Sequence, residues 1–263
     1  MGMITSLQNP AIKNIVKLSK NRERREQQLF VIEGARELSL ALQSGYRPEA
    51  LYVCGEIFEK TKYPDLLSFL PGEIVFDISF PVFEKIAYRE NSDGIVALVK
   101  SKSHGLGDLV LSKNPFLILL ESVEKPGNLG AILRTADAAA VDAVIVCDPQ
   151  SDLYNPNVIR SSVGGLFTVQ TAVCSSEEAF EWLQNHNITS YAAELQAAEF
   201  YQQTDFSRPS AIVMGTEAEG LSDFWLKNAT KRIKIPMRGK IDSLNVSVST
   251  AVLTFEAMRQ RGF

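Results

Sequence analysis

The stretch FLILLESVEKPGNLGAILRTADAA, residues 116–139, decides the fold of the C-terminal half of the chain. Its apolar beginning predicts a strand over residues 116–120, and residues 129–140 have the apolar spacing of a helix. Between them lies a glycine-bearing turn, which at the start of a helix presents backbone N–H groups to an anion. A strand that runs through such a turn into a helix favours an α/β fold.

The spacing of the glycines argues against the common nucleotide-binding fingerprints. Gly127 and Gly130 are three residues apart, which does not match G-x-G-x-x-G, and no G-K-[ST] follows. An α/β enzyme that uses a dinucleotide is therefore the weaker alternative, since the acidic residue expected at the end of the next strand is also missing.

Arg134 is a candidate anion-binding residue on this predicted helix. It lies one helical turn after Gly130, so its guanidinium and the Asn128 amide are expected to face the same space. A planar group with five donors suits a phosphate. The alternative interpretation is a surface arginine that pairs with Asp137 or Glu121.

Further apolar runs of the same kind follow along the chain, at residues 143–146, 211–214 and 232–235. Helical patterns separate these runs. This alternation predicts a mainly parallel sheet with helices on both faces.

Two polar loops follow the later strands. GTEAEG, residues 215–220, has glycines that permit positive φ and a close backbone approach to a ligand, and Glu217 within it is placed to orient a polar group. An ordinary solvated connection is the alternative. In IKIPMRGKIDSLNVSVSTAV, residues 233–252, Ser243 or Asn245 is expected to cap the helix that ends near Arg259.

The N-terminal half is predicted to be a smaller α/β domain. A helix is expected over residues 10–18 and another over 35–43, with strands over 29–32, 50–53, 74–76 and 95–99. Residues 9–36 carry seven Lys and Arg side chains against three Glu. SKSHGLG, residues 101–107, has no periodicity, so we place the boundary there and expect domains at 1–104 and 105–263.

The composition restricts the class of protein. The 263 residues are 45% hydrophobic, which is enough for a core in each domain, and the net charge of -4 requires any site for an anionic polymer to be a local basic patch. Cys54, Cys147 and Cys174 form no C-x-x-C pair, so we expect no metal. No signal-peptide pattern or membrane-length apolar run is present, which predicts a cytoplasmic protein without a membrane partner.

The three loops together resemble the three motifs of the SpoU (TrmH-like) RNA 2′-O-methyltransferases of the SPOUT superfamily. The matching segments are PGNLGAILRTA, IVMGTEAEGLS and IPMRGKIDSLNVSVSTAV, in the family's order. NPNVIRSSVGGLF, residues 155–167, resembles the stretch between the first two motifs. Residues 6–42 are similar to the ribosomal-protein-like substrate-binding domain often fused ahead of the catalytic domain.

The resemblance implies a fold, a cofactor and an assembly. It implies a C-terminal trefoil knot, an exception to the rule that chains avoid knots. It also implies a homodimer with the active site at the subunit interface, and S-adenosyl-L-methionine as cofactor. The implied cofactor-binding residues are Met214, Gly215, Thr216, Glu217, Gly220, Ile235, Met237, Leu244 and Asn245.

The same resemblance implies catalytic and RNA-binding residues. The implied catalytic set is Arg134, Asn128, Glu217, Ser243 and Asn245, and the implied RNA-binding set is Lys13, Lys17, Arg22, Arg24, Arg25, Arg36 and Arg134. Because an arginine stays protonated at neutral pH, we interpret Arg134 as binding phosphate and stabilising the developing 2′-oxyanion. The general base stays unassigned.

The predicted function is therefore transfer of a methyl group from S-adenosylmethionine to a ribose 2′-hydroxyl of RNA. Ribosomal RNA is favoured by analogy with the fused domain alone. Methylation of tRNA, and a non-catalytic RNA-binding or ribosome-assembly protein with the same fold, are the alternatives. The sequence identifies neither the nucleotide nor whether the role is housekeeping modification or antibiotic resistance.

Overall fold

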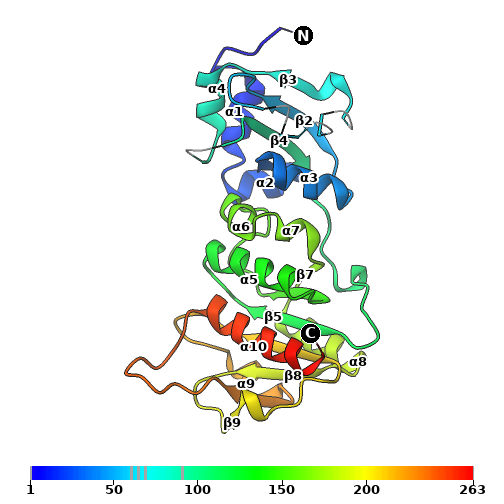
Figure 1. Ribbon diagram of the computed structural model, residues 1–263, viewed down its shortest axis with the longest axis vertical. Coiled ribbons are helices and arrows are strands. Elements are labelled where there is room, and N and C mark those ends of the chain that lie inside the picture. The colour runs from blue at the N-terminus through cyan, green and yellow to red at the C-terminus, as the bar shows by residue number, and fades with distance from the viewer. Residues whose placement is uncertain (1, 60–61, 64–65, 68–69, 90–91, 263) are drawn as a thin grey trace. The chain divides into compact units, whose positions relative to one another are not determined.

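The computed structural model describes residues 2–59, 62–63, 66–67, 70–89 and 92–262 (Figure 1). The chain forms two compact units, one of residues 1–102 and 153–168 and the other of residues 103–152 and 169–263. In the described ranges, no helix combines the length and the apolar composition needed to cross a bilayer.

The first unit is built on a mixed sheet. Its strands are β1 (Leu29–Glu33), β2 (Pro48–Val53), β3 (Val75–Asp77) and β4 (Ile95–Lys100). They are ordered β1-β4-β2-β3, with β4 antiparallel to both β1 and β2, and β2 parallel to β3. The helices of this part are α1 (Pro10–Lys17), α2 (Asn21–Gln27), α3 (Ala35–Gln43) and α4 (Phe80–Ile86).

One face of this sheet is covered by α1 and α4. Ile12 of α1 and Phe83 of α4 belong to the same buried cluster as Tyr52 of β2 and Val96 of β4. Since strand side chains alternate between the two faces, Tyr52 and Val96 mark the face on which these helices pack. The predicted smaller α/β domain is confirmed as a mixed-sheet unit.

The segment from Leu153 to Thr168 packs within the first unit, although it follows β6 in sequence. It contains α6 (Pro156–Ser162) and α7 (Gly165–Thr168). The ring of Tyr154 stacks on Phe30 with centroids 4.1 Å apart. Gly164 has φ of +89°, a backbone conformation that favours glycine, and a Cβ there would lie 2.5 Å from the Leu40 side chain. The predicted division into residues 1–104 and 105–263 placed this segment in the second domain instead.

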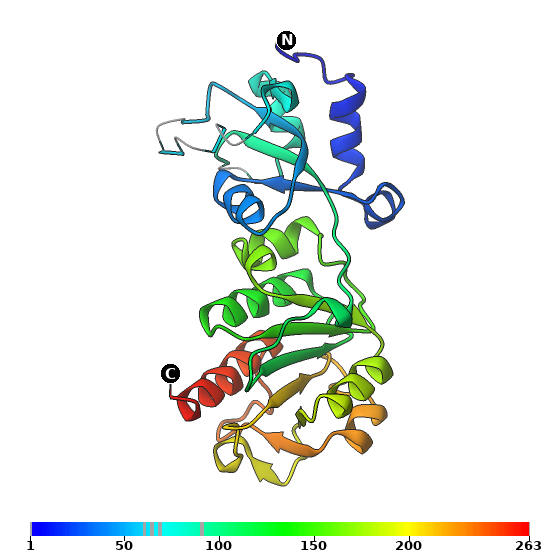
Figure 2. The same ribbon diagram turned by 90° about the vertical axis from the view of Figure 1, so that its right-hand side faces the viewer.

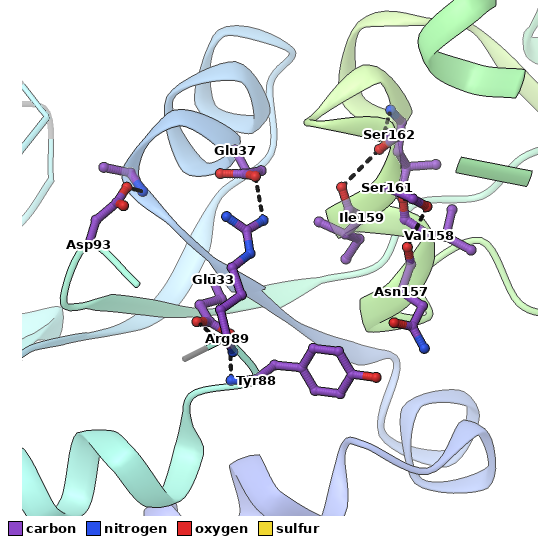
Figure 3. A network of polar contacts seen from close by, with 12 residues as sticks. Glu33, Glu37, Tyr88, Arg89, Asp93, Asn157, Val158, Ile159, Ser161 and Ser162 are labelled. Atoms are coloured by element: carbon purple, nitrogen blue, oxygen red, sulfur yellow. Dashed lines mark hydrogen bonds and ion pairs between the residues drawn. The ribbon is translucent and has the colours of Figure 1, made fainter. Parts of the chain in front are cut away.

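Figure 3 shows a polar network that ties β1 and α3 to the loop after α4. The buried carboxylate of Glu33 accepts hydrogen bonds from the backbone N–H groups of Tyr88 (2.6 Å) and Arg89 (3.2 Å). The Arg89 guanidinium pairs with the carboxylate of Glu37. The same view shows the Tyr88 ring projecting away from this network.

The second unit contains a seven-stranded sheet in the order β7-β6-β5-β10-β8-β11-β9. The strands are β5 (Phe116–Glu121), β6 (Ala143–Cys147), β7 (Thr171–Cys174), β8 (Thr189–Ala193), β9 (Glu199–Phe200), β10 (Ser210–Met214) and β11 (Lys231–Lys234). All of these pairings are parallel. This confirms the predicted parallel sheet.

Helices cover both faces of this sheet, which is the arrangement that a parallel sheet requires. They are α5 (Pro126–Ala138), α8 (Ser176–Asn185), α9 (Asp223–Asn228) and α10 (Val246–Gln260). Figure 2 shows α5 and α10 on one side of the sheet and α8 and α9 on the other. Leu117 and Leu119 of β5 pack with the fully buried Trp225 of α9.

The final helix returns to the first motif. Helix α10 contacts both α5 and β10, so the last segment of the chain lies against elements formed much earlier in the sequence. The trefoil knot stays a prediction, because strand order and register alone do not trace one.

Candidate active site

Hydrogen bonds join the three predicted motif loops at the carboxyl ends of the strands. Asn128, in the first turn of α5, donates its side-chain amide to the carboxylate of Glu217. Asn245 donates from Nδ2 to Oδ1 of Asn128 over 3.2 Å. Oδ1 of Asn245 accepts from the Ser247 N–H at 2.9 Å, and so caps α10. Between the two predicted caps, the structure selects Asn245.

The second motif loop is held in a tight turn. Thr216 and Gly220 exchange backbone hydrogen bonds of 2.9 and 3.2 Å, and Gly220 has φ of +72°. A Cβ on Gly215 would lie 2.1 Å from the carbonyl carbon and oxygen of Gly220. Glycine is therefore required at 215 by the close approach of two backbone segments.

A cavity of about 410 Å³ opens beside these loops in the second unit. Its walls combine large apolar side chains with several charged ones. The charged residues at the cavity are Glu194, Glu217, Glu219, Lys234 and Asp242, and the large apolar ones include Met214, Leu221, Leu226, Ile233, Ile235, Met237, Leu244 and Val246. Acidic groups outnumber basic ones, so the cavity suits a ligand that carries positive charge.

The cavity brings together most of the residues assigned to the cofactor by resemblance. Met214, Gly215, Thr216, Glu217, Gly220, Ile235, Met237 and Leu244 all line it. Asn245 does not line it and is linked to it through Asn128 and Glu217.

The candidate catalytic residues divide into two groups. Glu217 and Ser243 line the cavity, and the Ser243 hydroxyl donates to Asp242 at 3.1 Å. Asn128, Arg134 and Asn245 lie outside the lining. Arg134 is exposed on α5.

Glu121 binds the chain just after the second motif loop. Its carboxylate is buried and accepts hydrogen bonds from Ser222 N–H at 2.8 Å, Ser222 Oγ at 2.5 Å and Ser176 Oγ at 3.3 Å. The Glu121 carboxylate is thus hydrogen-bonded to the starts of α8 and α9. The alternative in which it pairs with Arg134 is wrong.

Cys147 and Cys174 sit opposite each other on β6 and β7, at the same edge of the sheet. A hydrogen bond with the Cys174 thiol, together with burial, raises the pKa of the Cys147 thiol. A thiol with a raised pKa is a poor nucleophile at neutral pH. This pair is therefore not a candidate for covalent catalysis.

The candidate RNA-binding residues of the first unit are not all accessible. Lys13, Lys17, Arg22, Arg25 and Arg36 are exposed on α1, α2 and α3. Arg24 is buried, and its guanidinium donates to the carbonyls of Leu18 (2.7 Å) and Ser19 (2.9 Å). Arg24 therefore secures the end of α1 instead of joining the exposed basic surface.

The sequence interpretation missed one charged side chain of the cavity wall that follows a strand. Glu194 directly follows β8, whose sequence TSYAA is too polar and too small in its side chains to be recognised as a buried strand. Its position at the carboxyl end of a strand was the available signal, because ligand-binding residues of parallel sheets gather at that edge.

Two family models match the chain. The model of the SpoU rRNA methylase family matches residues 115–255. The model of the MRM3-like substrate-binding domain matches residues 9–97.

Relatives and solved structures match nearly the whole chain. A 23S rRNA (guanosine(2553)-2′-O)-methyltransferase of Bacillus subtilis is 28% identical over 97% of this chain and 98% of its own. The crystal structure of an RNA 2′-O ribose methyltransferase is 38% identical, covers 100% of both chains and has a TM-score of 0.87. An AdoMet-bound rRNA methyltransferase from Sinorhizobium meliloti is 28% identical, covers 98% of this chain and 97% of its own, and has a TM-score of 0.89.

Proposed function

The chain belongs to the SpoU rRNA methylase family, and we propose that it methylates a ribose 2′-hydroxyl in 23S ribosomal RNA. It is an RNA ribose 2′-O-methyltransferase that uses S-adenosylmethionine, which confirms the predicted activity and cofactor. Its substrate is ribosomal RNA. The choice of 23S RNA rests on the relative from Bacillus subtilis, which matches over nearly its full length.

The cavity residues fit S-adenosylmethionine on two observations. The excess of carboxylates complements a ligand with a sulfonium and an ammonium group. The backbone contact at Gly215 leaves main-chain groups, without side chains between them, at the cavity wall. We propose that the motif residues at this wall hold the cofactor. When bound, S-adenosylmethionine supplies a methyl group on a good leaving group.

The protein's own residues must then position the ribose and stabilise the charge that develops during methyl transfer. Arg134 remains a cation at neutral pH, and we propose that it binds the RNA phosphate and stabilises the negative charge that develops on the 2′-oxygen. Asn128, Ser243 and Asn245 orient the ribose and the loops. Glu217 fixes the side-chain orientation of Asn128 through their hydrogen bond.

We propose that the exposed basic side chains of α1 to α3 bind the RNA. A pocket of about 150 Å³ in the same unit supports this. Tyr88 at the pocket is an exposed aromatic ring, and Lys85 and Arg160 beside it are exposed cations. Aromatic rings stack on unpaired bases and cations bind phosphate, so looped RNA suits this surface better than a duplex.

A homodimer stays a proposal, supported by the outer surface of α10. Val248 and Phe255 are exposed by 48% and 42%. Large apolar side chains exposed on one helix are typical of a protein contact surface. Arg134 lies on the neighbouring helix α5 and outside this chain's own cavity lining, as expected if it serves the site of a second copy.

We also propose roles for the two domains and a location for the protein. We assign residues 1–104 to RNA binding and residues 105–263 to methyl transfer, supported by the ranges that the two family models match. A cytoplasmic location is supported by the three free cysteines, the state that a reducing compartment maintains.

The decisive experiment maps 2′-O-methyl groups in total RNA from cells with and without the gene. We expect one site in 23S RNA to be lost, and purified protein with labelled S-adenosylmethionine to restore it on the unmodified RNA. A lost site in tRNA or small-subunit RNA would refute the 23S assignment.

A further inference from the structure

Glu194 places a carboxylate at the wall of the cavity, outside all three motifs. Its backbone N–H donates to the Ile233 carbonyl at 3.0 Å, which fixes the residue to β11 just beyond the end of β8. Its side chain is only 13% exposed and lines the cavity. The backbone that carries this carboxylate is therefore held against the sheet.

One oxygen of this carboxylate lacks a hydrogen-bond donor. Oε1 of Glu194 is buried and, among the described residues, no N–H or O–H group donates to it. Nη1 of Arg232 lies 3.2 Å away, which makes an ion pair without the alignment of a hydrogen bond. A buried acceptor without a donor destabilises the protein, and a charged acceptor does so more strongly. Because Glu194 itself lines the cavity, a ligand bound there is an available source of a donor for this carboxylate.

We propose that Glu194 binds S-adenosylmethionine directly, with Oε1 accepting a hydrogen bond from a ribose hydroxyl or from the α-ammonium group of the cofactor. Both are strong donors, and a charge-assisted hydrogen bond to a buried carboxylate is among the stronger contacts available to a ligand. The inference rests on the proposed cofactor cavity and adds to it a side-chain contact from β8.

The competing explanation is that Glu194 exists only to pair with Arg232. The Arg232 side chain is 54% exposed, and ion pairs with an exposed partner contribute little to stability. That explanation predicts that the Arg232→Gln and Glu194→Gln variants lose the same small amount of stability and that neither loses cofactor affinity.

Calorimetric titration of the full-length protein separates these explanations. The ligands are S-adenosylmethionine and 5′-methylthioadenosine, which lacks the amino-acid portion. We expect Glu194→Gln and Glu194→Ala to bind S-adenosylmethionine about tenfold to a hundredfold more weakly than the unaltered protein. Arg232→Gln keeps the carboxylate and should bind at least as tightly as the unaltered protein. Glu181→Gln, an exposed carboxylate of α8 outside the cavity, is the matched control.

The second ligand identifies the donor. If Oε1 accepts from the ammonium group, Glu194→Gln lowers the affinity for S-adenosylmethionine only. If it accepts from the ribose, the variant lowers the affinity for both ligands equally. Unchanged affinity of both Glu194 variants for both ligands would overturn the inference while leaving the proposed cofactor site intact. Failure of the unaltered protein to bind S-adenosylmethionine would overturn the site and the inference together. Thermal melting of each variant verifies that it is folded.

Discussion

Asn245 and Asn128 are joined by a side-chain hydrogen bond of 3.2 Å although 117 positions separate them in the sequence. Asn128 in turn donates a hydrogen bond to Glu217 in the second motif loop. The start of α5, the turn after β10 and the start of α10 are therefore tied together by three polar side chains. The loops that border the cavity are held relative to one another by this chain of hydrogen bonds.

Replacing Asn245 by Asp separates its two roles. The Asp side chain still caps α10 but cannot donate to Oδ1 of Asn128. We expect thermal stability to change little and the methyl-transfer rate to fall at least about tenfold. Asn245→Ala, which removes the cap as well, should also lose about 1 kcal/mol of stability. If Asn245→Asp methylates RNA at the normal rate, the link to Asn128 has no part in the reaction.

Replacing Arg134 by Ala should abolish turnover and leave cofactor binding nearly intact. The loss is expected to be about a hundredfold or more, because a cation that stabilises developing negative charge is removed. Labelled S-adenosylmethionine reports the rate, and calorimetry reports the affinity. Arg134→Lys retains the positive charge but lacks the planar guanidinium. Its methylation rate should lie between the rates of the unaltered protein and of Arg134→Ala. Near-normal methylation by Arg134→Ala would rule out the assigned role.

Replacing Gly215 by Ala should eliminate cofactor binding. The new methyl group would start 2.1 Å from the Gly220 carbonyl and would displace the loop at the cavity. Calorimetry with S-adenosylmethionine measures the loss, and circular dichroism verifies the fold. Gly107→Ala is the control, since a Cβ there meets no atom within 4 Å. Equal affinity of the Gly215 variant and the control would show that the loop adjusts.

Removing Lys13 and Lys17 together should weaken RNA binding and leave cofactor binding unchanged. Both side chains are exposed on α1. Each lysine that contacts a phosphate contributes about one unit to the slope of log affinity against log salt, so the double alanine variant should lower the slope by about two. Filter binding over a salt series measures this. The same slope in Lys227→Ala and in the double variant would place the RNA elsewhere.

Replacing Glu121 by Gln should destabilise the second unit. The amide nitrogen of Gln is a donor and would face either the Ser222 N–H or the hydroxyls of Ser222 and Ser176, depending on which oxygen it replaces. We expect a loss of about 1–3 kcal/mol in the free energy of unfolding, measured by urea denaturation. Glu177→Gln, an exposed acid of α8, should change it far less. Identical denaturation midpoints for the two variants would contradict this structural role.

The sequence predicts well the parts of the fold that depend on local pattern. The expected helix over residues 35–43 matches α3, and the apolar strands that become β5, β6 and β10 are each recognised within a residue. Buried parallel strands rich in Val, Ile and Leu are distinctive without knowledge of their neighbours.

The weaker predictions involve long-range packing. β8 escapes recognition because it does not form a strongly apolar run, although Ser190 and Ala192 are buried. The strand lies inside the sheet, between β10 and β11. Arg24 is indistinguishable in sequence from the exposed Arg25, and only the fold directs its guanidinium to the carbonyls at the end of α1. The donor-less oxygen of Glu194 likewise depends on the placement of β11, which no local pattern encodes.

The position of β10 between β5 and β8 has a consequence for protein synthesis. A ribosome completes β5 and β8 before it makes residues 210–214, so the two strands wait with unpaired edges for a partner that has not yet been translated. Open strand edges are templates for wrong pairing, and non-local pairings form slowly. A nascent chain that stalls between residues 193 and 210 should therefore be a preferred client of chaperones and an early source of aggregates.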